Sequence, residues 1–417
     1  MIRRILIASI LVGLFVPAYA GIDGLTGTTF HFTAKQDFIT TPDGGSITIW
    51  GYANANVVGS RAQYPGPTLI VNEGDTVTIT LDSEPTFAVP VSLVFPGQSK
   101  VTATGGTPGA LTNEAGANGA SSVTYSFVAS SPGTYMYHSG TRPDLQAEMG
   151  LLGAIIVRPS LGANYAYDDA GTRFDQEYLF LLTDVDPTFH DLIEFGEMAS
   201  IDTSKFYPVY WFINGRAAPD TMAPANSPFL PTQPYNALPR MHPGEKLLMR
   251  VIGAGRDLHP FHHHGNHAQI IARDGRLLSS APGAGPDLAH AVFTIQSVPG
   301  ETVDALFEWT GKGLGWDIYG HAPGDPLQPN EYAGDHGKAF PVVMPELQNL
   351  AIGPHWNGSP FLGTFGDLPP GTGNLNLNAG YYHMWHSHNE KEIVNFDLFP
   401  GGMMTMLIIE PAGVPIP

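Results

Sequence analysis

The stretch His259-Pro260-Phe261-His262-His263-His264-Gly265 places three histidines at offsets of zero, three and five. Successive side chains of an extended segment point to opposite faces, so His262 and His264 share one face. Two imidazoles on one face of a strand can hold one metal ion or two adjacent ones. The stretch therefore predicts a strand that carries metal ligands.

Two further stretches repeat this alternation. His386-Ser387-His388 again places two imidazoles on one face, and Tyr137-His138-Ser139-Gly140 has the first half of the same pattern. Any one of these histidines could instead be a strand residue that hydrogen-bonds to the backbone. The recurrence of the pattern in three places favours a shared metal site.

Together with Pro65-Gly66-Pro67-Thr68 and Glu73-Gly74-Asp75-Thr76-Val77, these stretches give the chain its family likeness. The chain resembles the multicopper oxidases over nearly all of its length after residue 20. The resemblance implies an all-β fold of tandem cupredoxin-like Greek-key β-sandwiches. The 49 glycines and 37 prolines, which separate short β-branched runs such as Ser46–Trp50, agree with that fold class.

The chain divides into three predicted parts. Residues 1–20 are predicted to be a cleavable secretory signal, because Arg3 and Arg4 precede a short apolar run that ends at Ala18-Tyr19-Ala20. Residues 21–160 are expected to form the first cupredoxin-like domain. Residues 161–417 are expected to form the second, with a long insertion at about 310–378.

Internal similarity supports two copies of one domain. Pro243-Gly244-Glu245 and the β-rich run after it repeat the pattern of Glu73-Gly74-Asp75. The stretch Ala379–Ser387 repeats the pattern of Pro132–Ser139. Repeats of this kind predict two sandwiches of common ancestry.

Composition limits the function. The formal net charge of −19 argues against nucleic acid and anionic membrane surfaces as partners, and no long apolar run follows the signal. The absence of cysteine excludes disulfides and every thiolate site. We therefore expect an exported protein, periplasmic or extracellular, without a membrane anchor.

The resemblance also implies where copper would bind. Members of the family use H-x-H, H-S-H, H-P-x-H-x-H and H-C-H motifs. In this chain, Val94 and Pro96 replace the two histidines of the H-x-H motif, and Gly140 replaces the second histidine of the H-S-H motif. By family assignment, His138 and His388 would bind one of the two paired coppers. His264 and His386 would bind the other, and His262 would bind the single copper.

The family's blue-copper site is also damaged, because Ser387 stands where the family has cysteine. His259 and Met403 remain from that site. A hydroxyl is a poor copper ligand beside a thiolate, so the resemblance predicts fewer than four copper ions per site, with zinc or another divalent metal as an alternative. The acidic pairs Asp184/Asp186 and Glu390/Glu392 are expected to lie in solvated turns.

Three functions remain open. The first is an exported multicopper-oxidase-like protein that binds metal at the residual histidines, with weak or altered oxidoreductase activity toward a small-molecule or metal-ion reductant. The second is a catalytically silent scaffold, and the third is an active oxidase with a non-standard route of electron entry. By resemblance to two-domain members of the family, we also expect a homotrimer in which His138 faces the other four histidines across a subunit boundary.

Overall fold

A computed structural model describes residues 21–319, 321–322, 324–339, 358–360, 381–410 and 413–416. The predicted signal at 1–20 lies outside the described residues, as do residues 340–357 and 361–378 of the predicted insertion.

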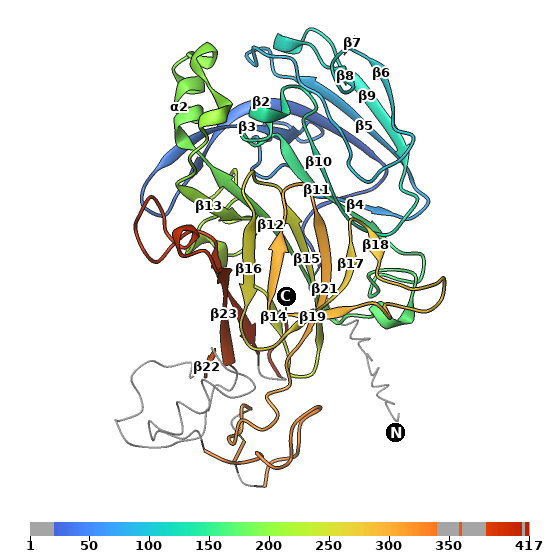
Figure 1. Cartoon of the computed structure of the whole chain (residues 1–417), viewed down its shortest axis with the longest axis vertical. Helices are drawn as coiled ribbons and strands as arrows, with labels where there is room; N and C mark the ends of the chain where they lie inside the picture. The colour runs from blue at the N-terminus through green and yellow to red at the C-terminus, as the bar shows by residue number, and fades with distance from the viewer. Residues whose placement is uncertain are drawn as a thin grey trace, which may run out of the picture.

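Two sheets form the first β-sandwich, in the upper half of Figure 1. The smaller sheet has the order β1 (Leu25–Thr26), β4 (Leu69–Asn72), β11 (Leu152–Arg158), β10 (Gly133–His138). The larger has the order β3 (Ser46–Asn54), β2 (Thr29–Thr40), β5 (Thr76–Ser83), β9 (Val123–Val128), β6 (Thr102–Gly105). A short ribbon pairs β7 (Thr107–Pro108) with β8 (Asn113–Glu114), and α1 (Pro143–Gln146) follows β10.

The second sandwich lies below the first in Figure 1. One sheet has the order β13 (Tyr210–Ile213), β12 (Gln176–Val185), β15 (Lys246–Gly253), β21 (Thr302–Glu308), β17 (Ala268–Arg273), β18 (Arg276–Leu277), with β19 (His290–Val292) also paired to β17. The other has the order β14 (Arg240–Met241), β24 (Met404–Ile409), β23 (Tyr381–Ser387), β16 (His259–His263), β20 (Thr294–Ser297), with β22 (Gly358–Pro360) beside β23.

The two sandwiches repeat one strand topology. β5 lies parallel to β2 and antiparallel to β9, and β15 lies parallel to β12 and antiparallel to β21. In the other sheet of the first sandwich, β11 lies parallel to β4 and antiparallel to β10. In the other sheet of the second, β24 lies parallel to β14 and antiparallel to β23. The sequence repeats therefore correspond to equivalent strands, and the tandem cupredoxin-like prediction is confirmed. The predicted boundary at 160/161 falls between β11 and β12.

Alternating side chains build each core. In β5, Val77, Ile79 and Leu81 point inward while the intervening threonines are half-buried or exposed. In the second sandwich, the strand that carries the histidines contributes Phe261, which packs near Phe180 and Trp385. The period-two pattern buries one face of each strand and leaves the other face free for chemistry.

A buried ionic network joins the sandwiches. Arg250 on β15 donates through Nε to Glu177 Oε2 at 3.0 Å and through Nη1 to Thr134 Oγ1 at 3.0 Å. Arg158, at the end of β11, donates to the same Glu177 oxygen at 2.7 Å. The helix α2 (Pro187–Glu194) also packs on the first sandwich, where His190 Nδ1 contacts the Thr48 carbonyl at 2.5 Å. The two sandwiches are therefore held together by buried polar contacts.

Within the described part of the chain, no helix has both the length and the apolar character needed to cross a membrane.

Candidate metal centre

Strand pairing creates the histidine cluster. β16 and β23 run antiparallel with His262 directly opposite His386, and His264 follows just beyond the end of β16. Residues opposite each other on antiparallel strands have Cβ atoms about 5 Å apart, so their side chains meet on the same face. His388 follows β23 on the other side of this pair, where its backbone N–H donates to the Pro260 carbonyl at 2.8 Å.

The rings converge closely. The Nε2 atoms of His264 and His386 are 3.1 Å apart, and one ligand nitrogen from each of His262, His264 and His386 lies within 4.8 Å of the others. The His388 ring centre is 5.0 Å from that of His262. Two imidazole nitrogens bound to one ion at about 2.0–2.1 Å are separated by about 3 Å. His264 and His386 therefore already have the spacing of two ligands of a single metal ion.

Neighbouring groups fix the rings. His386 Nδ1 donates to the Ser387 carbonyl at 2.6 Å, which leaves Nε2 as the lone-pair nitrogen facing the cluster. His262 Nδ1 shares a hydrogen bond with Thr294 Oγ1 on β20 at 2.9 Å. Metal-binding histidines usually have their second nitrogen held in this way. Thr294 is a neighbour of the candidate site that the sequence alone did not single out.

The cluster favours neutral imidazole. Burial, together with His264 and His386 nearby, lowers the pKa of His262 to about 4. Burial also lowers the pKa of His386 below its ordinary value. Neutral imidazole is the form that binds metal, so these ligands are available at neutral pH.

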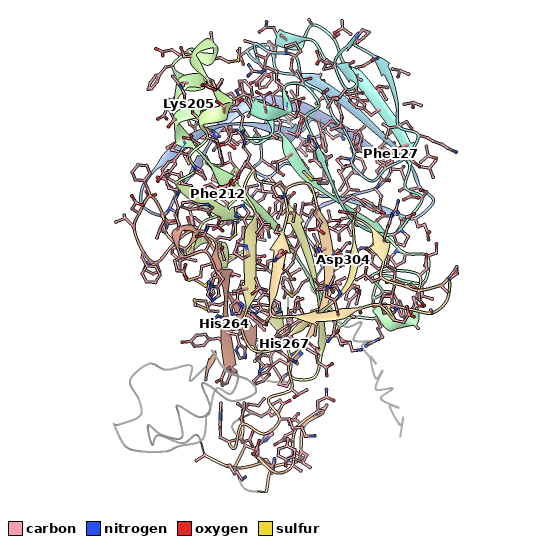
Figure 2. All side chains as sticks on the ribbon, viewed as in Figure 1. Phe127, Lys205, Phe212, His264, His267 and Asp304 are labelled. Atoms are coloured by element: carbon pink, nitrogen blue, oxygen red, sulfur yellow. The ribbon has the colours of Figure 1, made fainter. Side chains whose placement is uncertain are left out.

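His138 lies elsewhere, in the first sandwich. Its backbone pairs with Val94, and its Nδ1 donates to the Ser139 carbonyl at 2.9 Å. A Cβ placed on Gly140 would lie 2.7 Å from Val94 Cγ1, so the positions that lost their histidines now pack against each other. Among the described residues, two groups of histidines and carboxylates have metal-binding geometry, and His138 belongs to neither of them. Figure 2 shows His264 on the second sandwich, well below the first.

A carboxylate fills the other predicted metal position. Glu392 Oε2 accepts a 2.5 Å hydrogen bond from Ser387 Oγ and lies 3.0 Å from His259 Nδ1, between the two side chains. Met403 is buried, and its backbone N–H donates to the Glu392 carbonyl at 2.8 Å. The Glu392 carboxylate therefore lies between His259 and Ser387, two residues of the family's blue-copper position, and the Met403 backbone binds the Glu392 backbone.

The expectation of solvated turns for the acidic pairs is wrong for three residues. Asp184, Asp186 and Glu392 are each at most 3% exposed, and only Glu390 is exposed. Asp184 accepts backbone N–H groups of Arg256 and Asp257 and lies 3.6 Å from His259 Nε2. Burial disfavours the charged His259 ring, but the carboxylates of Glu392 and Asp184 outweigh it and raise the pKa of His259.

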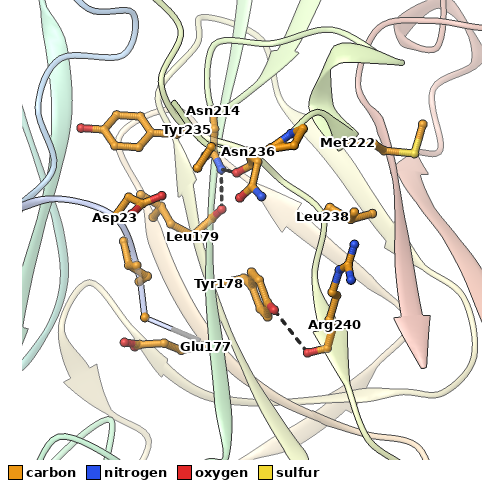
Figure 3. Close-up of a pocket in the computed structure, with 14 residues that line it drawn as sticks. Asp23, Glu177, Tyr178, Leu179, Asn214, Met222, Tyr235, Asn236, Leu238 and Arg240 are labelled. Atoms are coloured by element: carbon orange, nitrogen blue, oxygen red, sulfur yellow. Dashed lines mark hydrogen bonds between the residues drawn. The ribbon is translucent and has the colours of Figure 1, made fainter. Parts of the chain in front are cut away.

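A separate cavity of about 460 Å³ lies beside β12 and β14 (Figure 3). Two of its polar side chains bind the cavity wall, since Tyr178 donates to the Arg240 carbonyl and Asn214 donates to the Leu179 and Asn236 carbonyls. No histidine lines this cavity, so it is not part of the cluster.

Residues 43–161 match the family described as multicopper oxidase. This segment is a multicopper oxidase domain. The chain is 32% identical over 133 residues to an L-ascorbate oxidase of Cucurbita maxima, and this match covers 31% of this chain and 21% of that protein. Laccase 1 of Metarhizium acridum is 40% identical over 100 residues, which covers 24% of this chain and 16% of that protein. The matches thus span about a fifth of the length of these relatives.

Solved structures of multicopper oxidases share the fold. The multicopper oxidase mgLAC superimposes with a TM-score of 0.56 at 18% identity and covers 94% of this chain and 88% of its own. A blue copper oxidase from Nitrosomonas europaea gives the same TM-score and identity, and the match covers 92% of this chain and 86% of that protein's chain. At this identity the likeness extends to the fold alone.

The family's two kinds of copper position differ in this chain. The cluster offers an all-imidazole donor set with one nitrogen pair already at ligand spacing, so its residues fit copper. The position around Ser387 has no thiolate and contains the Glu392 carboxylate, so its residues do not fit a blue copper ion. Of the two positions, only the histidine cluster therefore has a donor set that fits copper.

Proposed function

We propose that the protein is an exported metal-binding protein of multicopper oxidase type that holds copper at His262, His264, His386 and His388, with weak or altered oxidoreductase activity. The observation that carries the proposal is the 3.1 Å approach of the His264 and His386 Nε2 atoms beside the buried His262 ring, together with the lowered pKa of His262 and His386. Bound copper would supply one-electron redox chemistry there. Export rests on the signal-like residues 1–20.

The chain's own groups prepare this site. Thr294 and the Ser387 carbonyl orient His262 and His386, so little rearrangement is needed when metal binds. The His388 side chain is 57% exposed, which gives a small-molecule or metal-ion reductant a way to the cluster from solvent. We propose fewer than four ions per site, because Val94, Pro96 and Gly140 supply no ligand.

Copper loading tests this function. We expect the purified protein to bind Cu²⁺ in preference to Zn²⁺ without the intense blue absorption of a copper–thiolate bond, because the chain has no cysteine. Turnover of a phenolic or metal-ion reductant under air should be slow. Fast turnover would favour an active oxidase with a different electron entry, whereas the absence of bound metal at micromolar copper would favour a silent scaffold.

We also propose a head-to-tail homotrimer. His138 lies on the first sandwich and the other four histidines lie on the second, where His388 is solvent-exposed and His264 half-buried. A ring would let the first sandwich of one subunit cover the cluster of the next, so that His138 adds a fifth imidazole.

Light scattering of the full chain at micromolar concentration should give the mass of three subunits. In the trimer, His138→Ala should lower copper affinity, and the control His31→Ala, at a half-exposed histidine paired with Asp82, should not. A monomer with and without copper would contradict the ring.

A further inference from the structure

A second group of metal-ligating side chains lies far along the chain from the histidine cluster, between Trp316 and Lys338. Asp317, His321, Glu331 and His336 each offer one ligand atom, and these four atoms lie within 4.8 Å of one another. His321 Nδ1 is 2.9 Å from Asp317 Oδ2 and 3.2 Å from Glu331 Oε1. His336 Nδ1 is 2.6 Å from that Glu331 oxygen and 3.9 Å from that Asp317 oxygen.

These distances fit four ligands around one centre. A tetrahedral ion with bonds of about 2.05 Å has ligand atoms about 3.3 Å apart. The four distances between the histidine Nδ1 atoms and the carboxylate oxygens lie on both sides of that value. Hydrogen bonding alone explains the arrangement less well. His321 Nδ1 carries at most one proton yet faces two carboxylate oxygens, and Glu331 Oε1 faces two ring nitrogens.

The group is largely withdrawn from solvent. The side chains of Asp317 and Glu331 are 0% and 4% exposed, and those of His321 and His336 are 10% and 19% exposed. Carboxylates buried to this degree need a positive partner, because an unpaired buried charge is costly. In the described part of the chain, the nearby cation Lys338 forms its ion pair with Asp335, at 3.7 Å, and not with Asp317 or Glu331.

Asp335 gives an independent indication of a bound cation. It is 6% exposed, and its Oδ2 has no hydrogen-bond partner among the described residues. Asp335 lines a cavity of about 10 Å³ together with Asp317 and Glu331. A cavity of that size holds about one water molecule or one small ion.

We propose that Asp317, His321, Glu331 and His336 form a second metal site, which takes a divalent first-row cation of the Zn²⁺ class. Two imidazole nitrogens and two carboxylate oxygens are a donor set that Zn²⁺ accepts in tetrahedral geometry. The ligands come from both ends of the segment, which the backbone already brings together, since Asp317 N–H donates to the Lys338 carbonyl and Gly337 N–H donates to Asp317 Oδ2. The ion clamps this segment next to β23, where Trp316 stacks on Tyr381.

The test uses the full chain with His264→Ala and His386→Ala, so that the histidine cluster is disabled and the two sites are measured separately. Metal is removed by a chelator, and Co²⁺ is added as a spectroscopic probe for Zn²⁺. We expect one equivalent of Co²⁺ with the absorption of a tetrahedral ion, displaced by one equivalent of Zn²⁺, and a higher melting temperature with either metal.

Two variants in this background make the result specific. Glu331→Gln keeps the shape of the side chain but removes its charge, and His321→Ala/His336→Ala removes both imidazoles; each should weaken Co²⁺ binding at least 100-fold. The matched control His242→Ala, at a histidine paired with Glu245 outside the group, should bind as the parent does. Equal Co²⁺ affinity in Glu331→Gln and the parent, or no Co²⁺ binding by the folded parent, would overturn the proposal.

Discussion

Replacing both His264 and His386 by alanine is expected to lower the affinity of the protein for copper at least 100-fold. The two rings supply the nitrogen pair with ligand spacing, and their loss leaves only His262 and His388 at the site. Removing even an outer partner of a metal ligand costs about 10–100-fold in affinity, so removing two direct ligands should cost more. Competition with a chromophoric copper chelator measures this change.

The matched control is His267→Ala/His290→Ala, which also removes two imidazoles but at exposed positions. It should leave copper affinity within about threefold of the unaltered chain. Circular dichroism should show the same β content for both variants, so that a loss of copper affinity reports lost ligands and not a lost fold. Equal copper affinity in the two double variants would show that copper binds elsewhere.

Glu177→Gln is expected to destabilise the protein by about 3–5 kcal/mol, because it removes the carboxylate to which the buried Arg250 guanidinium donates and leaves only Asp304, at 3.6 Å, as its charged partner. Glu177 and Arg250 are at most 3% exposed, and Glu177 also accepts from Arg158 of the first sandwich. Urea unfolding should report this loss. The surface control Arg61→Gln, which breaks a partly exposed pair with Asp37, should cost about 1 kcal/mol or less.

The same pair predicts a pH dependence. Burial raises the pKa of Glu177, but Arg250 and Arg158 outweigh it and hold the pKa below its ordinary value. A carboxylate with a lowered pKa contributes stability above its unfolded pKa of about 4.3, and this contribution is lost as the pH falls through the folded value. The difference between Glu177→Gln and the unaltered chain should therefore shrink below about pH 4. A difference that grows in acid would contradict this account.

The family resemblance predicted the tandem cupredoxin-like fold, and period-two alternation predicted which histidines of one strand share a face. His262 and His264, like His386 and His388, are two residues apart, so each pair shares a face whatever the details of the sheet. The register that sets His262 opposite His386 could not be deduced, because strand pairing depends on contacts between distant segments.

Other features of the sites could not be predicted for related reasons. Thr294 supports His262 from β20, a strand that carries no metal motif. Asp184 and Glu392 looked like surface acids, because no local pattern shows that a buried His259 lies between them. Asp317, His321, Glu331 and His336 come together through an irregular segment, where neither strand nor helix spacing applies.

Anomalous diffraction at the copper edge, from crystals of the full chain grown with copper, tests the central proposal most directly. The account predicts an anomalous peak among His262, His264, His386 and His388, about 2.0–2.1 Å from the Nε2 atoms of His264 and His386. It also predicts no peak between Ser387 and His259, where Glu392 lies. A copper peak at Glu392, or no peak within reach of His264 and His386, would contradict it.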